Sequence, residues 1–194
     1  NSMRNSGAPR KNGAPWTLVG AFLTKAKSFS DGFAFRAKER GIWRTWTYRT
    51  TVEETSRLAA GMSKLGVSRG DHVAIIGPNN PRLYMAILAS QTIGAVPVLF
   101  HPDVGPGEIG HHQTVQGLRL VFGNNLAGTD SVTNGIVDTT GWIGTVVVEK
   151  DDARQIDNDK SITYGSVLDG GAGVVEGEHD WLEKAVSGLS DTDP

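Results

Sequence analysis

The sequence predicts an α/β fold, with a mostly parallel sheet flanked by helices and an N-terminal β-hairpin. Two observations carry this prediction. Short apolar segments alternate with helical segments through the middle of the chain, which is the pattern of βαβ units. The apolar segments are rich in Val and Ile on both faces, as is typical of strands that are covered on both sides. The 194-residue length suits one domain of ordinary size.

The first expected elements are two extended segments, at 33–36 and 42–47. Aromatic and β-branched residues flank the turn KERG, which indicates a β-hairpin. A helix follows, because apolar residues then recur at helical spacing, at Val52, Leu58, Ala59, Met62 and Leu65.

The ends of this helix carry recognisable signals. Thr47 can cap its start, and Thr50 with Glu53 matches the spacing of a capping box. Gly66 supplies a stop at its C-terminal end.

The remaining elements alternate in type. Strands are expected at 73–76, 96–100, 120–122 and 145–148, and helices over 81–94, 107–115 and 180–187. Pro81 suits the first turn of its helix, and Gly94 ends it. The Gly- and Thr-rich stretch before the last strand has no clear pattern, so we expect no element there.

The amino-acid composition excludes several classes of function. The chain is 38% hydrophobic and 21% charged, with a net charge of −2, which is typical of a globular protein without a large basic surface for nucleic acid or an anionic membrane. It has no cysteine, which excludes disulfides, thiolate catalysis and Cys-type zinc sites and is typical of a cytoplasmic protein. No apolar run reaches the ~18 residues of a membrane span.

One glycine pattern suggests a dinucleotide-binding loop. Gly105, Gly107 and Gly110 spell G-x-G-x-x-G after an apolar segment. In a true fingerprint the first glycine follows the strand directly, whereas HPDV intervenes here, and Pro106 removes a backbone N–H that a phosphate would need. No acidic residue lies at the ribose-binding spacing. We therefore interpret this stretch as a Gly/Pro loop that enters a weak helix.

Other chemical signals are incomplete. The stretch DTTGWIG at 138–144 has no lysine for a phosphate, and we interpret it as the approach to the strand at 145–148. The histidines lack the spacing of metal ligands: His72, His101, His111, His112 and His179. No G-x-S-x-G elbow is present. The sequence therefore assigns no catalytic, cofactor-binding or metal-ligating residue.

One continuous block, from Gly41 to Pro102, has a family resemblance. Its pieces keep the family's order and spacing: Thr47–Tyr48, Arg57–Gly61, Leu65–Val67, Gly70–Asp71, Val73–Ile76, Asn79–Pro81 and Gly94–Val98. The block resembles the N-terminal part of adenylate-forming (AMP-dependent) acyl-CoA synthetases. Trp43 and Trp46 favour the long-chain fatty-acid branch.

The resemblance implies the N-terminal subdomain of the acyl-CoA synthetase fold. It also implies a parent enzyme that uses ATP and Mg²⁺ to form an acyl-adenylate and then transfers the acyl group to coenzyme A. The final residues resemble the segment before the family's phosphate loop, so we expect this chain alone to be inactive and to carry no cofactor. The loop at 78–81 would lie near the acyl pocket, whereas Leu83, Ile87 and Leu88 are expected in the core.

The expected domain organisation has two parts. Residues 1–15 form a disordered leader that begins with a tag remnant, and residues 16–194 form the N-terminal subdomain, truncated before the phosphate loop. The expected partner is the remainder of the synthetase chain, whose substrate is a small carboxylic acid. Neither a nucleic-acid partner nor a membrane span is expected. A homodimer is a further possibility that the sequence does not decide. The alternative is a free-standing, non-catalytic α/β domain that binds a partner or an acyl ligand.

Overall fold

The computed structural model describes residues 17–39, 41–124, 135, 140–148, 160–177 and 180–189, without the side chains of 112–116. Its centre is a five-stranded sheet in the order β4-β3-β5-β6-β7. The strands are β3 (His72–Ile76), β4 (Val96–Phe100), β5 (Leu118–Gly123), β6 (Gly144–Val147) and β7 (Ser161–Thr163). Every neighbouring pair is parallel, which confirms the expected sheet type.

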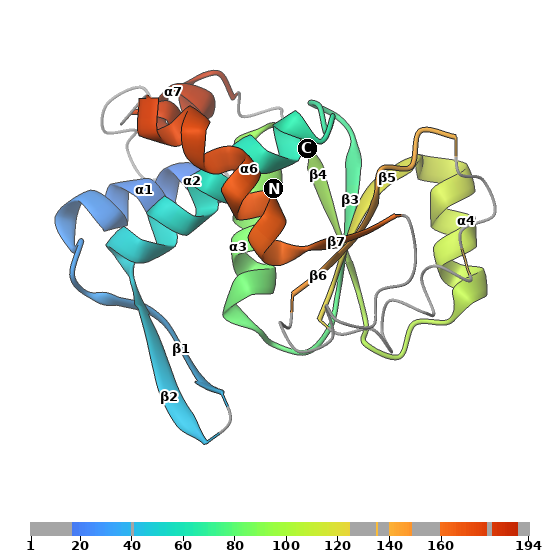
Figure 1. Cartoon of the computed structure of the whole chain (residues 1–194), viewed down its shortest axis with the longest axis horizontal. Helices are drawn as coiled ribbons and strands as arrows, with labels where there is room; N and C mark the ends of the chain where they lie inside the picture. The colour runs from blue at the N-terminus through green and yellow to red at the C-terminus, as the bar shows by residue number, and fades with distance from the viewer. Residues whose placement is uncertain are drawn as a thin grey trace, which may run out of the picture.

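Helices cover the two faces of the sheet unequally. On one face lie α2 (Tyr48–Lys64), α3 (Pro81–Thr92) and α6 (Tyr164–Gly177), and on the other lies α4 (Pro106–Gln116) (Figure 1). Side chains alternate along β3 accordingly. Val73 and Ile75 pack into the core beneath the first group of helices, and Ala74 and Ile76 pack into the core on the α4 side. Apolar residues on both faces of a strand therefore mean that both faces are buried.

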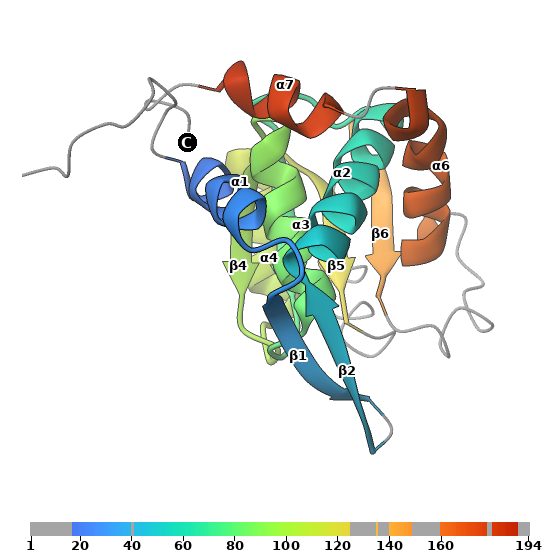
Figure 2. The same ribbon diagram turned by 90° about the vertical axis from the view of Figure 1, so that its left-hand side faces the viewer.

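A third apolar cluster brings together helices from the two ends of the described chain. It joins α1 (Leu18–Ser28) and α7 (Trp181–Ser187) to α3 (Figure 2). The buried members are Val19, Leu23, Leu88, Leu182, Val186 and Leu189. Among the described residues, no helix combines the length and hydropathy needed to cross a bilayer.

The predicted hairpin is present and antiparallel, formed by β1 (Phe33–Glu39) and β2 (Ile42–Thr47). Phe35, Ala37 and Trp46 on its inner face pack against the main core, while its far end projects beyond the helices (Figures 1 and 2). The hydroxyl of Thr47 accepts a hydrogen bond from the Thr50 backbone N–H (3.2 Å), so Thr47 caps α2 as expected.

The prediction of a capping box formed by Thr50 and Glu53 is wrong. Thr50 lies inside the first turn of α2, and its own hydroxyl donates to the Thr47 carbonyl. Thr50 is therefore a residue of the helix and not its N-cap. Gly66 follows the helix with φ = +97°, which a residue with a Cβ rarely adopts, and it confirms the expected stop.

Three elements were missing from the prediction: α1, β7 and α6. α1 has a capping hydroxyl at Thr17, but its buried side chains pack against α3 and α7, which are both distant in sequence. α6 contains Gly170, Gly171 and Gly173, and each interior glycine costs a helix about 1 kcal/mol relative to alanine. Packing against α2 outweighs that cost. The expected leader at 1–15 lies outside the described residues.

Candidate functional site at the carboxyl edge of the sheet

The carboxyl ends of β3 and β5 form the candidate site. The connection from β3 leads through α3 to β4 on one side, whereas β5 lies on the other side of β3. α3 and α4 consequently cover opposite faces (Figure 1). Open α/β sheets bind ligands at such a topological switch point, outside the carboxyl ends of the strands. The residues at this point are those of the β3–α3 loop, 77–80, and Asn124 directly after β5.

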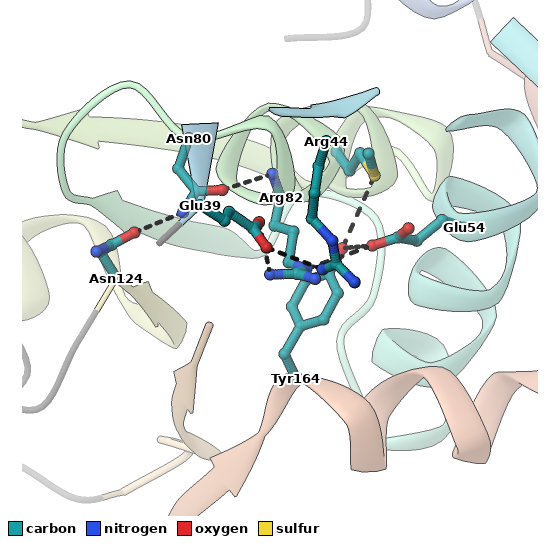
Figure 3. A network of polar contacts seen from close by, with 8 residues as sticks. Glu39, Arg44, Glu54, Asn80, Arg82, Asn124 and Tyr164 are labelled. Atoms are coloured by element: carbon teal, nitrogen blue, oxygen red, sulfur yellow. Dashed lines mark hydrogen bonds and ion pairs between the residues drawn. The ribbon is translucent and has the colours of Figure 1, made fainter. Parts of the chain in front are cut away.

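Asn80 fixes the geometry of the loop. Its Oδ1 accepts a hydrogen bond from the Arg82 backbone N–H (2.9 Å) and so caps α3, and its Nδ2 donates to Oδ1 of Asn124 (2.8 Å) (Figure 3). The Asn124 backbone N–H in turn donates to the Ile76 carbonyl (3.2 Å). One side chain therefore joins the ends of two adjacent strands while it starts a helix, and this bridge holds the loop in place.

Gly77 allows this close approach. Its φ is +150°, and a Cβ built there would lie 2.8 Å from both the Asn124 Cβ and the Leu83 Cδ1. Any side chain would push the two strand ends apart. The turn after β3 therefore needs glycine for its backbone conformation and for the contact with Asn124.

Asn79 and Tyr84 lie at the outer side of the loop. The Tyr84 hydroxyl donates to Asn79 Oδ1 (2.9 Å), and its ring stacks on Phe35 of the hairpin with 5.7 Å between centroids. The side chains of Asn79, Asn80 and Asn124 are neutral amides. They can orient a ligand by hydrogen bonds, but they cannot act as a general acid or base at neutral pH.

A charged network links this loop to the hairpin and to α6 (Figure 3). Arg82 lies two residues after Asn80, in the first turn of α3, and its guanidinium lies 3.4 Å from Glu39 of β1 and 3.9 Å from Glu54 of α2. Arg44 of β2 pairs with the other oxygen of Glu39 (2.9 Å). Arg82 therefore couples the hairpin to the start of α3.

Tyr164 is the most buried group of this network, with 5% of its surface exposed. Its hydroxyl donates to Glu54 Oε1 (3.0 Å). Burial, followed by the negative charge of Glu54 and the hydrogen bond to it, raises the pKa of Tyr164 well above its ordinary value, while Arg82 has the opposite, smaller effect. Tyr164 therefore stays protonated and serves as a hydrogen-bond donor.

Sequence reasoning missed this network. Glu54, Arg82 and Tyr164 come from three segments that local patterns do not connect, and Tyr164 starts a helix that the glycine content concealed. The loop at 78–81, in contrast, is expected from the family resemblance to lie near the acyl pocket. Leu83 and Leu88 are buried and Ile87 packs against the core, so their expected place is confirmed.

The G-x-G-x-x-G stretch has the structure that its spacing predicts. β4 ends at Phe100, α4 begins at Pro106, and Gly107 and Gly110 lie within the helix. A Cβ on Gly105 or Gly107 would meet no heavy atom within 4 Å, so neither glycine serves a close approach. These glycines belong to a loop and helix start.

The other sequence signals lie apart from one another. His72 lies on β3, His101 follows β4 beside Asp103 (Nδ1 to Oδ2, 3.5 Å) and His111 lies in α4. The side chain of His112 and all of His179 lie outside the described residues. Within the described part, no three histidine or carboxylate side chains gather as metal ligands. The end of the DTTGWIG stretch leads into β6 with Trp142 buried, as interpreted, whereas 138–139 lie outside the description.

Comparison with known proteins identifies the family of this fold. Over 78 residues, 40% of this chain and 14% of the relative, the chain is 32% identical to 4-coumarate:CoA ligase 1 of Petunia hybrida. Over 102 residues, 52% of this chain and 18% of the relative, it is 38% identical to 2,3-dihydroxybenzoate-AMP ligase of Bacillus subtilis. The chain therefore spans less than a fifth of the length of these two relatives.

A solved structure shares the fold. The chain is similar to acetoacetyl-CoA synthetase from Streptomyces lividans, with a TM-score of 0.66 and 17% identity over 77% of this chain and 24% of that one. The shared part is the N-terminal part of the fold of adenylate-forming ligases. The family model described as AMP-binding enzyme matches residues 22–180, from within α1 to the residue before α7. A match over most of its length places the chain in the AMP-binding enzyme family.

Proposed function

We propose that the chain is the N-terminal part of an ATP-dependent acid–thiol ligase whose acid is a fatty acid. In the first step of that reaction, a carboxylate oxygen attacks the α-phosphorus of ATP and pyrophosphate leaves. In the second, the coenzyme A thiolate attacks the acyl carbon and AMP leaves. The observation that supports this proposal most is the family match over 22–180 on a fold with its switch point at β3 and β5.

The described residues do not fit ATP and Mg²⁺ by themselves. Adenylation needs cations and aligned donors around the phosphates. The switch point offers the amides of Asn79, Asn80 and Asn124 instead, and Asn80 is already engaged in the cap and the bridge to Asn124. We therefore assign no catalytic step to these residues. We propose that the phosphate loop follows residue 194 in the parent chain and that this chain alone is inactive.

The role of this chain in the parent would be to position the β3–α3 loop. The Asn80–Asn124 bridge and the Arg82 network hold that loop from both sides, which suits a scaffold at the edge of an acyl pocket. The fatty-acid assignment rests on Trp43 and Trp46 in the hairpin. Trp46 is buried beside Arg82, and Trp43 is exposed.

ATP–pyrophosphate exchange tests the proposal. The product of the longer reading frame would be assayed with palmitate, 4-coumarate and 2,3-dihydroxybenzoate, and the 194-residue chain would serve as the matched control. We expect exchange with palmitate for the longer product and none for the chain.

Each other result has a separate meaning. Exchange with an aromatic acid alone would contradict the fatty-acid assignment but would support the proposal that the parent is a ligase. No exchange with a broad panel of acids would contradict the ligase. Exchange by the 194-residue chain would contradict the assignment of the ATP site to the rest of the parent.

A further inference from the structure

The far end of the hairpin carries a surface that the proposed ligase reaction does not use. In the antiparallel register Lys38 lies opposite Trp43 and Arg36 lies opposite Thr45, so these side chains share the outer face. Ile42 lies next to the turn opposite Glu39, so its side chain belongs to the other face and is beside Trp43 only because both residues are at the tip. We call Arg36, Lys38, Ile42 and Trp43 the hairpin tip surface. In Figures 1 and 2 the tip extends past all the labelled helices and strands, so a flat partner can reach it without meeting the body of the protein.

The hairpin tip surface is positively charged. Glu39, the only carboxylate of the two strands, belongs to the inner face, where Arg44 and Arg82 neutralise it. The Arg36 guanidinium lies over the Trp43 ring (4.6 Å to the centroid). Within the described part of the chain, neither Arg36 nor Lys38 pairs with a carboxylate. The small net charge of the whole chain therefore conceals a local excess of cations.

The same surface exposes large apolar side chains. Ile42 is 72% exposed and Trp43 is 56% exposed. Tryptophan favours the interface between bilayer and water, where its ring meets apolar chains and its N–H stays hydrated. Lysine and arginine stems can lie along apolar surface while their charges meet lipid headgroups. Cations that flank exposed apolar groups on a projecting element are thus complementary to an anionic bilayer surface.

We propose that the hairpin tip surface docks the protein on anionic lipid bilayers. Ile42 and Trp43 insert at the headgroup level, and Arg36 and Lys38 contact the anionic headgroups. A nucleic acid would meet the two cations but would leave Ile42 without an apolar partner. This docking does not depend on the ligase reaction, so the two proposals can fail separately.

Vesicle flotation with the purified chain tests the docking. The probes are vesicles of pure phosphatidylcholine and vesicles with about 30% phosphatidylserine, at low and at high salt. We expect binding to the anionic vesicles, weakened by salt, and little binding to the neutral ones.

Matched variants test whether vesicle binding depends on the hairpin tip surface or on exposed side chains elsewhere. Lys38→Gln should weaken the partition coefficient about fivefold, which is the effect of removing one cation near an anionic bilayer. Lys64→Gln removes an exposed cation at the end of α2 and should change nothing. Ile42→Ser should weaken binding about tenfold, as loss of one inserted aliphatic side chain predicts, whereas Leu99→Ser, at a position on β4 that is 65% exposed, should not.

Three results would overturn the proposal. One is absence of binding to anionic vesicles at low salt. The second is equal loss of binding in Lys38→Gln and Lys64→Gln, which would indicate attraction by overall charge. The third is self-association, measured by light scattering, that Ile42→Ser abolishes, because the surface would then belong to a second copy of the chain.

Discussion

α2 and α6 pack against each other on the same face of the sheet, yet only α2 is recognisable in the sequence. α2 has apolar residues at helical spacing, a capping threonine and a glycine stop. α6 contains glycines in its middle, which are usually signals against a helix. The difference teaches that glycine in a helix can be chosen for packing rather than for flexibility.

The close contact between these helices has a specific geometry. A Cβ on Gly61 of α2 would collide with the Val167 backbone carbonyl, and a Cβ on Gly171 of α6 would collide with the Arg57 carbonyl. The two backbones therefore touch where both helices lack side chains. Other α6 glycines differ: a Cβ on Gly170, Gly173 or Gly177 would meet nothing within 4 Å.

Gly171→Ala should have the largest effect. The new methyl group meets backbone rather than a movable side chain, so the helices must separate, and overpacking of this kind costs about 3 kcal/mol of unfolding free energy. Urea denaturation measures the loss. A change below about 0.5 kcal/mol, the usual size of a harmless surface substitution, would contradict the close helix contact.

Tyr164→Phe should cost about 1 kcal/mol near neutral pH, because it removes the buried hydrogen bond from α6 to Glu54 of α2. The effect should depend on pH. Above about pH 10 the unfolded chain releases the Tyr164 proton while the folded protein keeps it, so the wild type loses stability as pH rises.

The difference between wild type and Tyr164→Phe should accordingly shrink at alkaline pH. Urea titrations at about pH 8 and about pH 11 measure it. Tyr84→Phe is the control, because it removes the hydroxyl of a half-exposed tyrosine outside the contact between α2 and α6. A constant difference at both pH values would argue against a protonated, buried Tyr164.

Gly173→Ala should act in the opposite direction. Gly173 is exposed and has open space around a built Cβ, so alanine gains helix propensity of about 0.8 kcal/mol without a collision. Thermal unfolding of this variant beside Gly171→Ala makes a matched pair within one helix. Destabilisation of both variants to the same extent would mean that packing does not distinguish the two glycines.

Glu176→Gln should have the smallest effect. The pair between Arg57 of α2 and Glu176 of α6 is 3.4 Å long and exposed to solvent, and such pairs typically contribute only about 0.5 kcal/mol. Urea denaturation at low and high salt should detect little change. A loss above about 1 kcal/mol would show that the surface pair, and not the glycine contact, holds the helices together.

The sequence predicts well where local patterns decide the structure. The parallel strands, the Thr47 cap, the Gly66 stop and Pro81 in the first turn of α3 follow from periodicity and terminal residues. α6 could not be predicted, because its stability comes from contact with α2 across more than 100 residues, as the pairing of Tyr164 with Glu54 illustrates.

The candidate site likewise has one part that could be predicted from the sequence and one part that could not. The loop at 78–81 has a recognisable Asn-Asn-Pro sequence, so its importance can be predicted locally. Its partner Asn124 and the ion pairs of Arg82 with Glu39 and Glu54 depend on how the sheet is ordered and where the hairpin lies. No spacing in the sequence encodes these contacts.

The most direct test of the proposed ligase function is the coding sequence downstream of the codon for Pro194. We predict that it continues into a Ser-, Thr- and Gly-rich loop that ends in Pro-Lys-Gly, because the final residues of the chain resemble the segment before that loop. A stop codon in the place of this loop would contradict the proposal that the chain is the N-terminal part of an ATP-dependent ligase.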